Sequence, residues 1–586
     1  MRVLLVHPED GLQDGPWASQ KWDRVIDLGR SGADAYAHAS ATFGHPVTAL
    51  DDLRSDFKEI RRVRELFALG MGKLQDASGL DWWELTALLI HQQLEIVILL
   101  REFAATLGPS DEVHVSRPSF QAEALRWLLN ARLHVFPWRG SRHKRRAQHY
   151  AQMLKKFPVG QLAEIFWDKT DPGYQFRGMF SGRRRKEGSS PVVLLPSAYV
   201  NVSRVAIAYA QSLPETQFLL VATRRSGWVG SPPANVSMAW LRSYASVRVP
   251  SRKREYQELM ERWDRLRKEL SAIQEFKMLD DLGCLGGFPG RFEHGLEFRD
   301  AWQNVLDTEP VQGVICGDDS NRYTNIPLLL AKQKGLPTVS CHHGALDGRY
   351  MFKRCHADVM LVKGKMEEDY LVRVCGVPRE KVEVGAPFLA PASLTDEWKH
   401  GERPFIVLFS EPYEVAGGRV KDFYQDILPL LADLALSERR ELIVKLHPAE
   451  SLTERSRVVG QTLSPEQQRV TRVVSGALQA EMMNKTWFAI TVDSTVSVEC
   501  ALRGLPCFLC AWLESWPYGY VDQFTRFGAG IRLNQREEIR QIPEMLRNYK
   551  PSAGIRENCW TAIEPPRLQA LLGLNRKALS TATRQA

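Results

Sequence analysis

The most constraining feature of this sequence is a regular alternation of short apolar runs with longer helical stretches. Between residues 190 and 395 the runs are rich in Val, Ile and Leu, and helical patterns separate them. Strands of this composition, alternating with helices, predict a parallel sheet that is covered on both faces. The expected strands are 192–196, 218–223, 313–316, 338–342, 359–362 and 382–384. The expected helices are 202–212, 252–274, 300–307, 326–334 and 365–374. The expected fold class is therefore α/β.

The same alternation starts again after a polar stretch at 391–404, which reads as a linker. The expected strands of this second series are 405–409, 441–445, 488–491 and 507–510, with helices at 421–436, 478–484 and 495–503. We therefore expect one domain at 190–395 and another at 403–545, followed by a C-terminal helix and tail at 546–586.

Residues 1–185 form an N-terminal α/β extension in this interpretation, either part of the 190–395 domain or packed on it. The expected strands are 3–7, 46–50, 112–115 and 133–136, and the expected helices are 51–71, 81–107 and 119–130. Basic residues are concentrated at 139–146 and 183–186. The second run precedes a Gly/Ser tail and is typical of an exposed loop that could contact phosphate or lipid head groups.

The composition limits which cellular compartment and which binding partners are expected. The 586 residues carry a formal net charge of +8, which suits an anionic partner without selecting one. The basic residues are not interleaved with aromatic ones, so no nucleic-acid partner is expected. The apolar stretch at 82–100 contains Glu84 and Glu95, which favours a buried helix over a membrane span. The chain opening is too quickly charged for a secretory signal.

Cysteine usage points to a reducing compartment. The nine cysteines are scattered and odd in number, which argues against a disulfide framework. Cys507 and Cys510 lie in an expected buried strand, and no nearby His completes a zinc site. We expect a cytoplasmic protein that makes at most a peripheral contact with the inner face of the plasma membrane.

Two strand ends of the 190–395 domain carry candidate catalytic groups. In open parallel sheets, ligands bind beyond the carboxyl ends of the strands. Asp318 and Asp319 follow the 313–316 strand and could act as a base or cap the next helix. His343 follows the 338–342 strand and precedes Gly344. It could accept a proton from a hydroxyl nucleophile, or simply be satisfied by a backbone carbonyl.

The 403–545 domain carries hydroxyl, basic and acidic groups at its strand ends. Pro448 forces a sharp exit after the 441–445 strand, which would aim basic side chains at a diphosphate. A helix start near Ser494, its expected N-cap, would add backbone N–H groups for an anion. The alternative is a capped helix without ligand. The candidate donor-binding residues are Ser410, Glu411, Lys445, His447, Ser494, Thr495, Ser497 and Glu499. No DxD pair stands out, so neither a metal ligand nor a cofactor is expected.

Three stretches resemble a known superfamily. Residues 335–387 contain Cys341-His-His-Gly344 and end in Val382-Glu-Val-Gly-Ala-Pro387, and residues 445–448 read Lys-Leu-His-Pro. Residues 493–506 begin Asp-Ser-Thr and end Arg-Gly-Leu-Pro. Together they resemble GT-B glycosyltransferases, most closely bacterial capsule-polysaccharide transferases and CDP-glycerol glycerophosphotransferases. The resemblance covers roughly 190–545 and implies two Rossmann-like domains facing a cleft, with the acceptor on the first and the donor on the second.

The resemblance also implies roles for individual residues. His343 would be the base and His447 would contact the donor phosphate. Ser494 and Thr495 would lie at phosphate, and Glu499 would point toward the ribose. The sequence departs from the pattern at His342, where related transferases often carry Trp or Gln, and at the Asp-Ser-Thr helix start. Both departures favour a sugar donor over glycerophosphate.

The expected function is that of a metal-independent glycosyltransferase. It would move a sugar from a nucleotide-activated donor, which is a substrate and not a cofactor, to a glycan or lipid-linked acceptor of the capsule or lipopolysaccharide type. Two alternatives remain open: a non-hydrolysing sugar-nucleotide 2-epimerase, which needs no acceptor, and a non-catalytic nucleotide- or glycan-binding protein.

Overall fold

The computed structural model describes residues 1–54, 57–137, 190–245, 250–319, 322–388, 403–514 and 517–574. The chain divides into two compact units. Unit 1 consists of Met1–Glu59, Ile96–Arg146 and Pro391–Cys559, and unit 2 consists of Ile60–Glu95, Ala147–Ala390 and Trp560–Ala586. The basic runs at 139–146 and 183–186 and nearly all of the expected linker at 391–404 lie outside the described residues.

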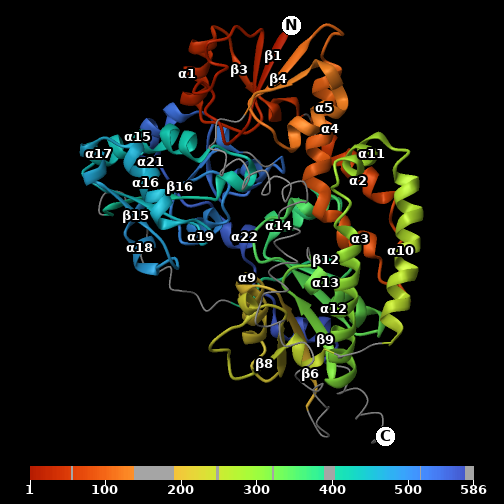
Figure 1. Cartoon of the computed structure of the whole chain (residues 1–586). Helices are drawn as coiled ribbons and strands as arrows, with labels where there is room; N and C mark the ends of the chain where they lie inside the picture. Colours follow the sequence, from red (N-terminus) through yellow and green to blue (C-terminus); the bar gives the residue numbers. More distant parts are fainter. Residues whose placement is uncertain are drawn as a thin grey trace, which may run out of the picture. The chain divides into compact units, whose positions relative to one another are not determined.

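Unit 1 contains the C-terminal sheet, whose strands are all parallel (Figure 1). Its spatial order, β15-β14-β13-β16-β17-β18, is the order 3-2-1-4-5-6 of a doubly wound Rossmann fold. The strands are β13 (Phe405–Phe409), β14 (Glu441–Lys445), β15 (Thr471–Val474), β16 (Thr486–Thr491), β17 (Cys507–Cys510) and β18 (Ile531–Leu533). The helices include α15 (Val420–Ser437), α16 (Leu452–Thr462), α17 (Pro465–Arg469), α18 (Ala480–Asn484), α19 (Val496–Leu502), α20 (Tyr520–Arg526), α21 (Ile542–Arg547) and α22 (Ile555–Cys559).

Both faces of the C-terminal sheet are buried, as its Val/Ile/Leu composition predicts. Ile406 and Leu408 of β13 belong to the core that includes α15, α16 and α21. Val407 and Phe409, which alternate with them, belong to a second core that includes Cys500 of α19. Successive side chains of a strand point to opposite faces, so one five-residue run contributes to two cores.

Unit 2 contains the central sheet, which is also parallel (Figure 1). Its order, β12-β11-β10-β9-β6-β7-β8, repeats the Rossmann pattern with one strand added. The strands are β6 (Val192–Ser197), β7 (Phe218–Ala222), β8 (Val236–Trp240), β9 (Val311–Cys316), β10 (Thr338–Cys341), β11 (Val359–Val362) and β12 (Val382–Val384). The helices include α3 (Trp82–Ala87), α9 (Val200–Gln211), α10 (Pro250–Leu270), α11 (Gln274–Asp281), α12 (Phe288–Thr308), α13 (Arg322–Gln333), α14 (Lys365–Asp369) and α23 (Pro565–Leu571).

The N-terminal extension forms a third parallel sheet in the order β3-β2-β1-β4-β5. Its first and fourth strands are neighbours, as in the other two sheets. The strands are β1 (Arg2–Val6), β2 (Arg24–Asp27), β3 (Val47–Ala49), β4 (Glu112–Val115) and β5 (Leu133–Val135). The helices are α1 (Ala33–Phe43), α2 (Lys58–Ala68), α4 (His91–Ala105) and α5 (Phe120–Leu129). The α/β fold class is therefore confirmed, with three Rossmann-ordered sheets.

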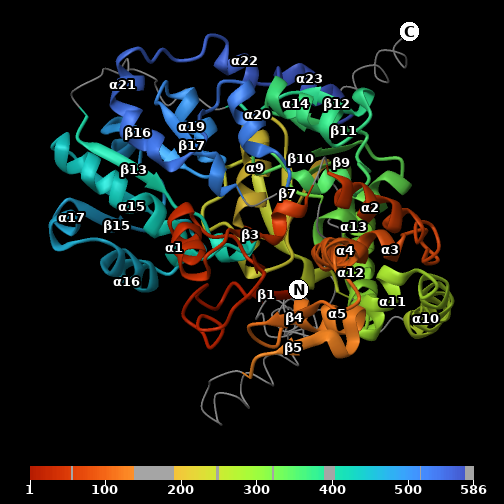
Figure 2. The same ribbon diagram turned by 90° about the horizontal axis from the view of Figure 1, so that it is seen from above.

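Residues 1–185, which were expected to form one extension that is part of the 190–395 domain or packed on it, are divided between the two units. The N-terminal sheet belongs to unit 1, and residues 60–95 belong to unit 2. Figure 2 shows α1 beside α15, and these two helices pack together. The boundaries between the units fall inside α2 and α4. A segment that contributes to two units cannot be assigned from its own hydrophobic pattern.

A buried ion pair joins the N-terminal sheet to the C-terminal Rossmann domain. Arg419, which precedes α15, binds Asp27 at the end of β2 with a shortest N–O distance of 2.6 Å. Asp27 is completely buried. Arg419 also donates to the carbonyls of Val6 and Pro8 at the end of β1. Its side chain thus fills the carboxyl end of the N-terminal sheet, where an open Rossmann sheet would place a ligand.

The loop before α15 approaches the N-terminal sheet closely. A Cβ on Gly29 would lie 2.6 Å from the carbonyl oxygen of Gly417. Gly417 itself has φ of 84°, in the left-handed region that glycine adopts readily. Arg30 donates its backbone N–H to the carbonyl of Gly417 and accepts from the N–H of Arg419. The Gly417-Gly418 pair therefore serves this contact.

The expected C-terminal helix and tail of 546–586 is also divided. Residues 546–559 belong to unit 1, and residues from Trp560 onward belong to unit 2. Ala562 forms a parallel bridge with Ala386 after β12. Ile563, Leu568 and Leu572 lie in the core of the central sheet together with side chains of α9. The described end of the chain therefore completes the central domain.

The expected buried helix at 81–107 is divided into α3, a 3-10 turn at Leu88–Ile90, and α4. Trp82–Ala105 is the one described helical stretch with the length and apolarity of a membrane span, and 67% of its apolar window is buried inside the protein. All nine cysteines are free and buried, which confirms the interpretation of Cys507 and Cys510 as core residues.

Candidate functional site: polar strand ends of two Rossmann sheets

The central sheet reverses its strand order between β6 and β9, and polar groups follow both strands. At such a switch point the connections leave in opposite directions, which is where open α/β sheets bind ligands. Tyr199 lies just beyond β6, and Asp318 lies just beyond β9. The Tyr199 hydroxyl donates to Asp318 Oδ2 at 2.5 Å. Asp318 was predicted from the sequence, but Tyr199 was not. The position of Tyr199, just after the first strand of the central sheet, could have indicated it.

His343 lies next to this pair. Its ring meets the Tyr199 ring edge-on, with centroids 5.5 Å apart. The His343 side chain is partly exposed, and its Nδ1 has no hydrogen-bond partner among the described residues. Because β9 and β10 are parallel neighbours, their ends meet at one edge of the sheet. The structure therefore brings the two predicted catalytic residues, His343 and Asp318, into one cluster.

The protonation states in this cluster suit proton transfer. Burial would raise the pKa of Asp318, but Arg349 and Lys353 more than offset it and hold that pKa below its usual range. Asp318 is therefore an anion at neutral pH. Burial lowers the pKa of His343, with Arg349 adding to the effect and Asp318 opposing it. His343 is consequently a neutral imidazole that can accept a proton, beside a carboxylate that stabilises the imidazolium.

The backbone that carries His343 is held in place by a buried lysine. Lys363, just beyond β11, donates its Nζ to the carbonyls of His342 and Gly344 at 2.7 Å each. His342 is buried, and burial lowers its pKa to about 3, so that it stays neutral. His342 Nδ1 accepts the Gly344 N–H at 3.2 Å. His342 therefore shapes the turn, whereas His343 is the residue that reaches solvent.

Asp319 and the charged side chains near it form a second buried group next to this cluster. Asp319 Oδ1 accepts from the Tyr350 hydroxyl at 2.5 Å and from Lys353 Nζ at 2.9 Å. Arg349 pairs with Asp347 at 2.8 Å. Burial opposes ionisation of Asp347, but Arg349 and Lys353 keep the pKa of that carboxyl well below its usual range. Asp319 was noted in the sequence beside Asp318, but Arg349 and Lys353, whose charges lower the pKa of Asp318, were not found from the sequence.

The C-terminal sheet reverses its strand order between β13 and β16, and two carboxyl groups meet there. Glu411 follows β13, and Asp493 follows β16. Glu411 Oε1 accepts from the Thr491 hydroxyl at 2.8 Å and from the Asp493 N–H at 3.1 Å. Burial and the neighbouring Glu411 raise the pKa of Asp493 well above its usual range. Asp493 is therefore a protonated acid over a range in which free Asp is ionised.

Three predicted donor-binding residues are hydrogen-bonded inside the protein, and a fourth, Ser497, is buried with no hydrogen-bond partner for its hydroxyl among the described residues. Ser410 is buried, with its hydroxyl 2.6 Å from the Tyr424 hydroxyl and 2.8 Å from Glu450 Oε1. Lys445 Nζ donates to the carbonyls of Leu446 and Gly476 at 2.8 Å each. Glu411 accepts hydrogen bonds from Thr491 and Asp493 at the end of β16. Ser497 is fully buried. Two of the three N–H donors of the Lys445 ammonium are thus used by backbone carbonyls.

The other four predicted donor-binding residues reach solvent. His447, Thr495 and Glu499 are exposed, and Ser494 is partly exposed. The His447 ring accepts the Ala449 N–H at its Nδ1, which orients the imidazole. α19 begins after Thr495 and not after Ser494, and Thr495 makes no side-chain capping bond. The β13–β16 edge thus offers hydroxyls, an imidazole and carboxyl groups, which suit the hydroxyls and phosphates of a nucleotide.

Asp493→Asn is expected to change how stability depends on pH. In the wild type, the folded protein holds a proton on Asp493 that the unfolded chain has lost above its ordinary pKa of about 3.9. Stability therefore falls as pH rises from that value toward the raised pKa of the folded state. Asn cannot ionise, so the midpoint of thermal unfolding should fall less steeply with pH in the variant. Differential scanning fluorimetry at a series of pH values measures both slopes.

The exposed Glu466 of α17 supplies the control for this experiment. Glu466→Gln also removes one carboxyl group, but it should leave the slope of the wild type unchanged. Equal slopes for the wild type and Asp493→Asn would show that Asp493 does not carry a buried proton.

Comparisons with known proteins give matches among solved structures only. No family model matches the chain, and no curated protein matches it. The matched structures include S. aureus MnaA with UDP, at 11% identity and a TM-score of 0.41 over 66% of this chain and 97% of that one. They also include Acinetobacter baumannii MurG, at 12% identity and a TM-score of 0.36 over 66% of this chain and 100% of that one.

A third match is Methanocaldococcus jannaschii UDP-GlcNAc 2-epimerase with UDP-GlcNAc and UDP, at 12% identity and a TM-score of 0.37 over 66% of this chain and 99% of that one. The matches thus include glycosyltransferases, the class that the sequence motifs resemble, and UDP-GlcNAc 2-epimerases, the class that was kept as an alternative. Likenesses at these scores carry no argument about activity, so the proposals below rest on the residues of this chain.

Proposed function

We propose that this chain is a glycosyltransferase that moves a sugar from a nucleotide-activated donor to a hydroxyl of a glycan or lipid-linked acceptor. The observation that carries the proposal is the cluster of His343, Tyr199 and Asp318 at the switch point of the central sheet. A neutral imidazole with an unpartnered nitrogen, beside a buried anion, can act as the general base that deprotonates an acceptor hydroxyl.

The donor is proposed to bind at the β13–β16 edge of the C-terminal sheet. His447 would donate to a phosphate oxygen, and Glu499 would accept from a ribose hydroxyl, because carboxylates accept and protonated or neutral imidazoles donate. When the sugar leaves, negative charge develops on the nucleotide diphosphate, and hydrogen bonds from His447, Ser494 and Thr495 would stabilise it. We propose that no metal ion takes part. We further propose that the protein works at the cytoplasmic face of the membrane that carries a capsule- or lipopolysaccharide-type acceptor.

Donor binding is the first test. Isothermal titration calorimetry with UDP, CDP, UDP-GlcNAc and other nucleotide-sugars should give saturable binding of at least one of them. His447→Ala should weaken that binding by roughly 10–100-fold, the value of one charge-assisted hydrogen bond. His38→Ala alters an exposed histidine of α1 and should leave it unchanged. Absence of binding to every nucleotide would remove the proposal.

Turnover separates the transferase from its alternatives. Labelled nucleotide-sugars are incubated with the protein, with and without a detergent extract of bacterial membranes, in the presence of EDTA. Transfer of label to a glycan or lipid only when the extract is present supports the proposal. Conversion of the nucleotide-sugar to its C2 epimer without extract would instead select the epimerase. Nucleotide binding without either reaction would select a binding protein.

A further inference from the structure

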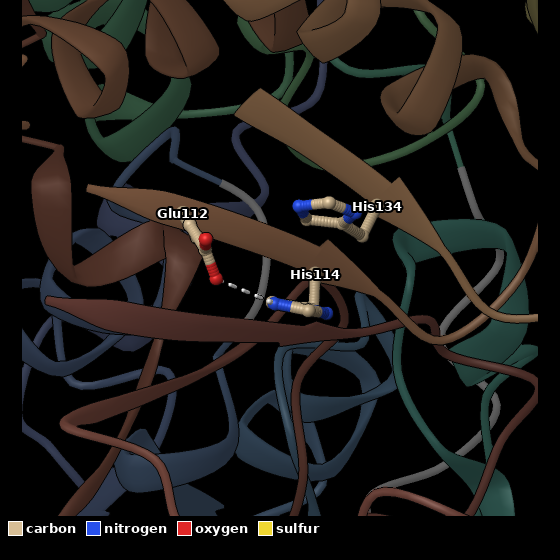
Figure 3. Close-up of side chains that lie close together, drawn as sticks. All are labelled: Glu112, His114 and His134. Carbon is tan, nitrogen blue, oxygen red and sulfur yellow. Dashed lines mark ion pairs between the residues drawn. The ribbon is translucent and has the colours of Figure 1, made fainter. Parts of the chain in front are cut away.

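A cluster of metal-ligating side chains lies on the N-terminal sheet, away from the strand ends described above. Glu112 and His114 are two residues apart on β4 and therefore point to the same face. His134 lies on the neighbouring strand β5, directly opposite His114 in the parallel register. Figure 3 shows the three side chains gathered on that face. Parallel pairing in register thus brings together residues that are about twenty positions apart in the chain.

The donor atoms are close enough to share one ion. The ligand atoms of Glu112, His114 and His134 all lie within 4.8 Å of one another. Glu112 Oε2 is 3.7 Å from His114 Nε2, and the two imidazole rings are stacked with centroids 4.6 Å apart. Around a tetrahedral Zn²⁺, with bonds of about 2.0–2.1 Å, donor atoms lie about 3.3 Å apart. Glu112 and His134 are both exposed and can therefore rotate by this small amount.

His114 is held by aromatic packing, and its Nε2 lacks a hydrogen-bond partner among the described residues. Trp22 packs edge-on against its ring at 4.9 Å, and Phe136 lies at 6.0 Å. His114 Nε2 is buried and makes no hydrogen bond with any described residue. A buried polar nitrogen without a partner costs free energy, so such atoms usually have an unseen water or ion. His114 Nε2, the nitrogen that faces Glu112, is therefore available to bind a metal ion.

One cation lies near the cluster. Arg2 stacks over Trp22 at 4.7 Å and donates to the carbonyl of Lys21 and to Gln20. Its charge opposes a bound cation, whereas the Glu112 carboxylate compensates directly as a ligand.

We propose that Glu112, His114 and His134 form a Zn²⁺ site, with water in the fourth position. Two imidazoles and one carboxylate suit zinc, whereas magnesium and calcium prefer oxygen ligands alone. The ion would tie the edge strand β5 to β4. This site does not depend on the proposed function, and it departs from the expectation of a chain without metal ligands.

The test is a zinc titration of the full-length protein without an affinity tag, after EDTA treatment and dialysis. Competition with a chromophoric chelator should show one tight site per chain. His134→Ala and Glu112→Gln change exposed side chains and should fold normally, and each should weaken zinc binding by roughly tenfold or more. Zinc should also raise the thermal unfolding midpoint of the wild type but not of His134→Ala.

Two controls and a spectrum make the outcome decisive. His38→Ala and His45→Ala remove described histidines that are not part of the cluster and should bind zinc like the wild type. X-ray absorption at the zinc edge should show nitrogen and oxygen neighbours, including imidazole scattering, in the wild type. Substoichiometric zinc, or equal affinity in the wild type and His134→Ala, would overturn the proposal. Loss of zinc in His45→Ala alone would place the site elsewhere in the chain.

Discussion

His343→Ala is expected to lower kcat by roughly 10²–10⁴-fold, the usual contribution of a general base. The reason is that His343 carries the neutral imidazole with an unpartnered nitrogen at the central switch point. KM for the donor should change little, because the donor is proposed to bind to the C-terminal sheet. Steady-state kinetics with the nucleotide-sugar identified by calorimetry measures both constants.

Asp318→Asn tests the same cluster through a different readout. The negative charge of Asp318 raises the pKa of His343 against the effect of burial. Removing that charge should lower the pKa, so the acidic limb of the pH profile of kcat/KM should shift to lower pH. A merely structural role for Asp318 would reduce activity without moving this limb. Full activity in His343→Ala would exclude this residue as the base.

Arg419→Met is expected to destabilise the protein by about 3–5 kcal/mol, the usual effect of removing one partner of a buried ion pair. Asp27 is completely buried, and the variant would leave its carboxylate without a cation. The carbonyls of Val6 and Pro8 would lose a donor as well. Urea unfolding, followed by tryptophan fluorescence, measures the loss through the midpoint of the transition.

The double variant Arg419→Met/Asp27→Asn separates charge burial from lost packing. Asn removes the unpaired charge, and its amide oxygen can still accept from the Gly29 N–H while its amide nitrogen donates to the Ser31 hydroxyl oxygen. The double variant should therefore be more stable than Arg419→Met alone. Arg457→Met on the exposed face of α16 should be neutral within about 0.5 kcal/mol. If Arg419→Met were as mild as this control, the pair would not hold the N-terminal sheet.

The sequence predicted the inner strands of the central and C-terminal sheets, but it missed β2 inside the N-terminal sheet and several outer strands. β2 reads Arg-Val-Ile-Asp, so its apolar run is only two residues long. β8, β15 and β18 lie at the edges of their sheets and were not predicted. Each has exposed positions, such as Ser237, Arg472 and Arg532, because only part of an edge strand is covered. A hydrophobic run is the signal of a strand buried on both faces, so half-buried strands escape it.

Helix α12 shows why one long helix was predicted too short. It starts at Phe288 instead of residue 300, and it contains Gly290 and Gly295. Glycine in a helix is unfavourable by about 1 kcal/mol, so a reading by propensity stops there. At Gly295 a Cβ would lie 2.1 Å from the ring of Trp82, so the absence of a side chain is required for packing.

The positions of the site residues could be predicted from the sequence, but the contacts of their side chains could not. Asp318 and His343 were found because parallel strands place their carboxyl ends at one edge. The engagement of Lys445 depends on the carbonyl of Gly476, and that of Ser410 on Glu450, which lie 31 and 40 positions away. Such partners come from tertiary contacts, so the residue type alone could not show whether these side chains face a ligand.

Because the C-terminal segment returns to the central sheet, the core of that sheet can be completed only late in the synthesis of the chain. The last strand of that sheet, β12, ends at Val384, but its core is completed only by Ile563, Leu568 and Leu572. At about 5–20 residues per second, a ribosome needs tens of seconds to make the intervening chain. During this time an apolar stripe beside α9 stays uncovered on the nascent protein. Chaperones that hold unfolded chains would recognise such a stripe, and translation that stops early would leave a product destined for degradation.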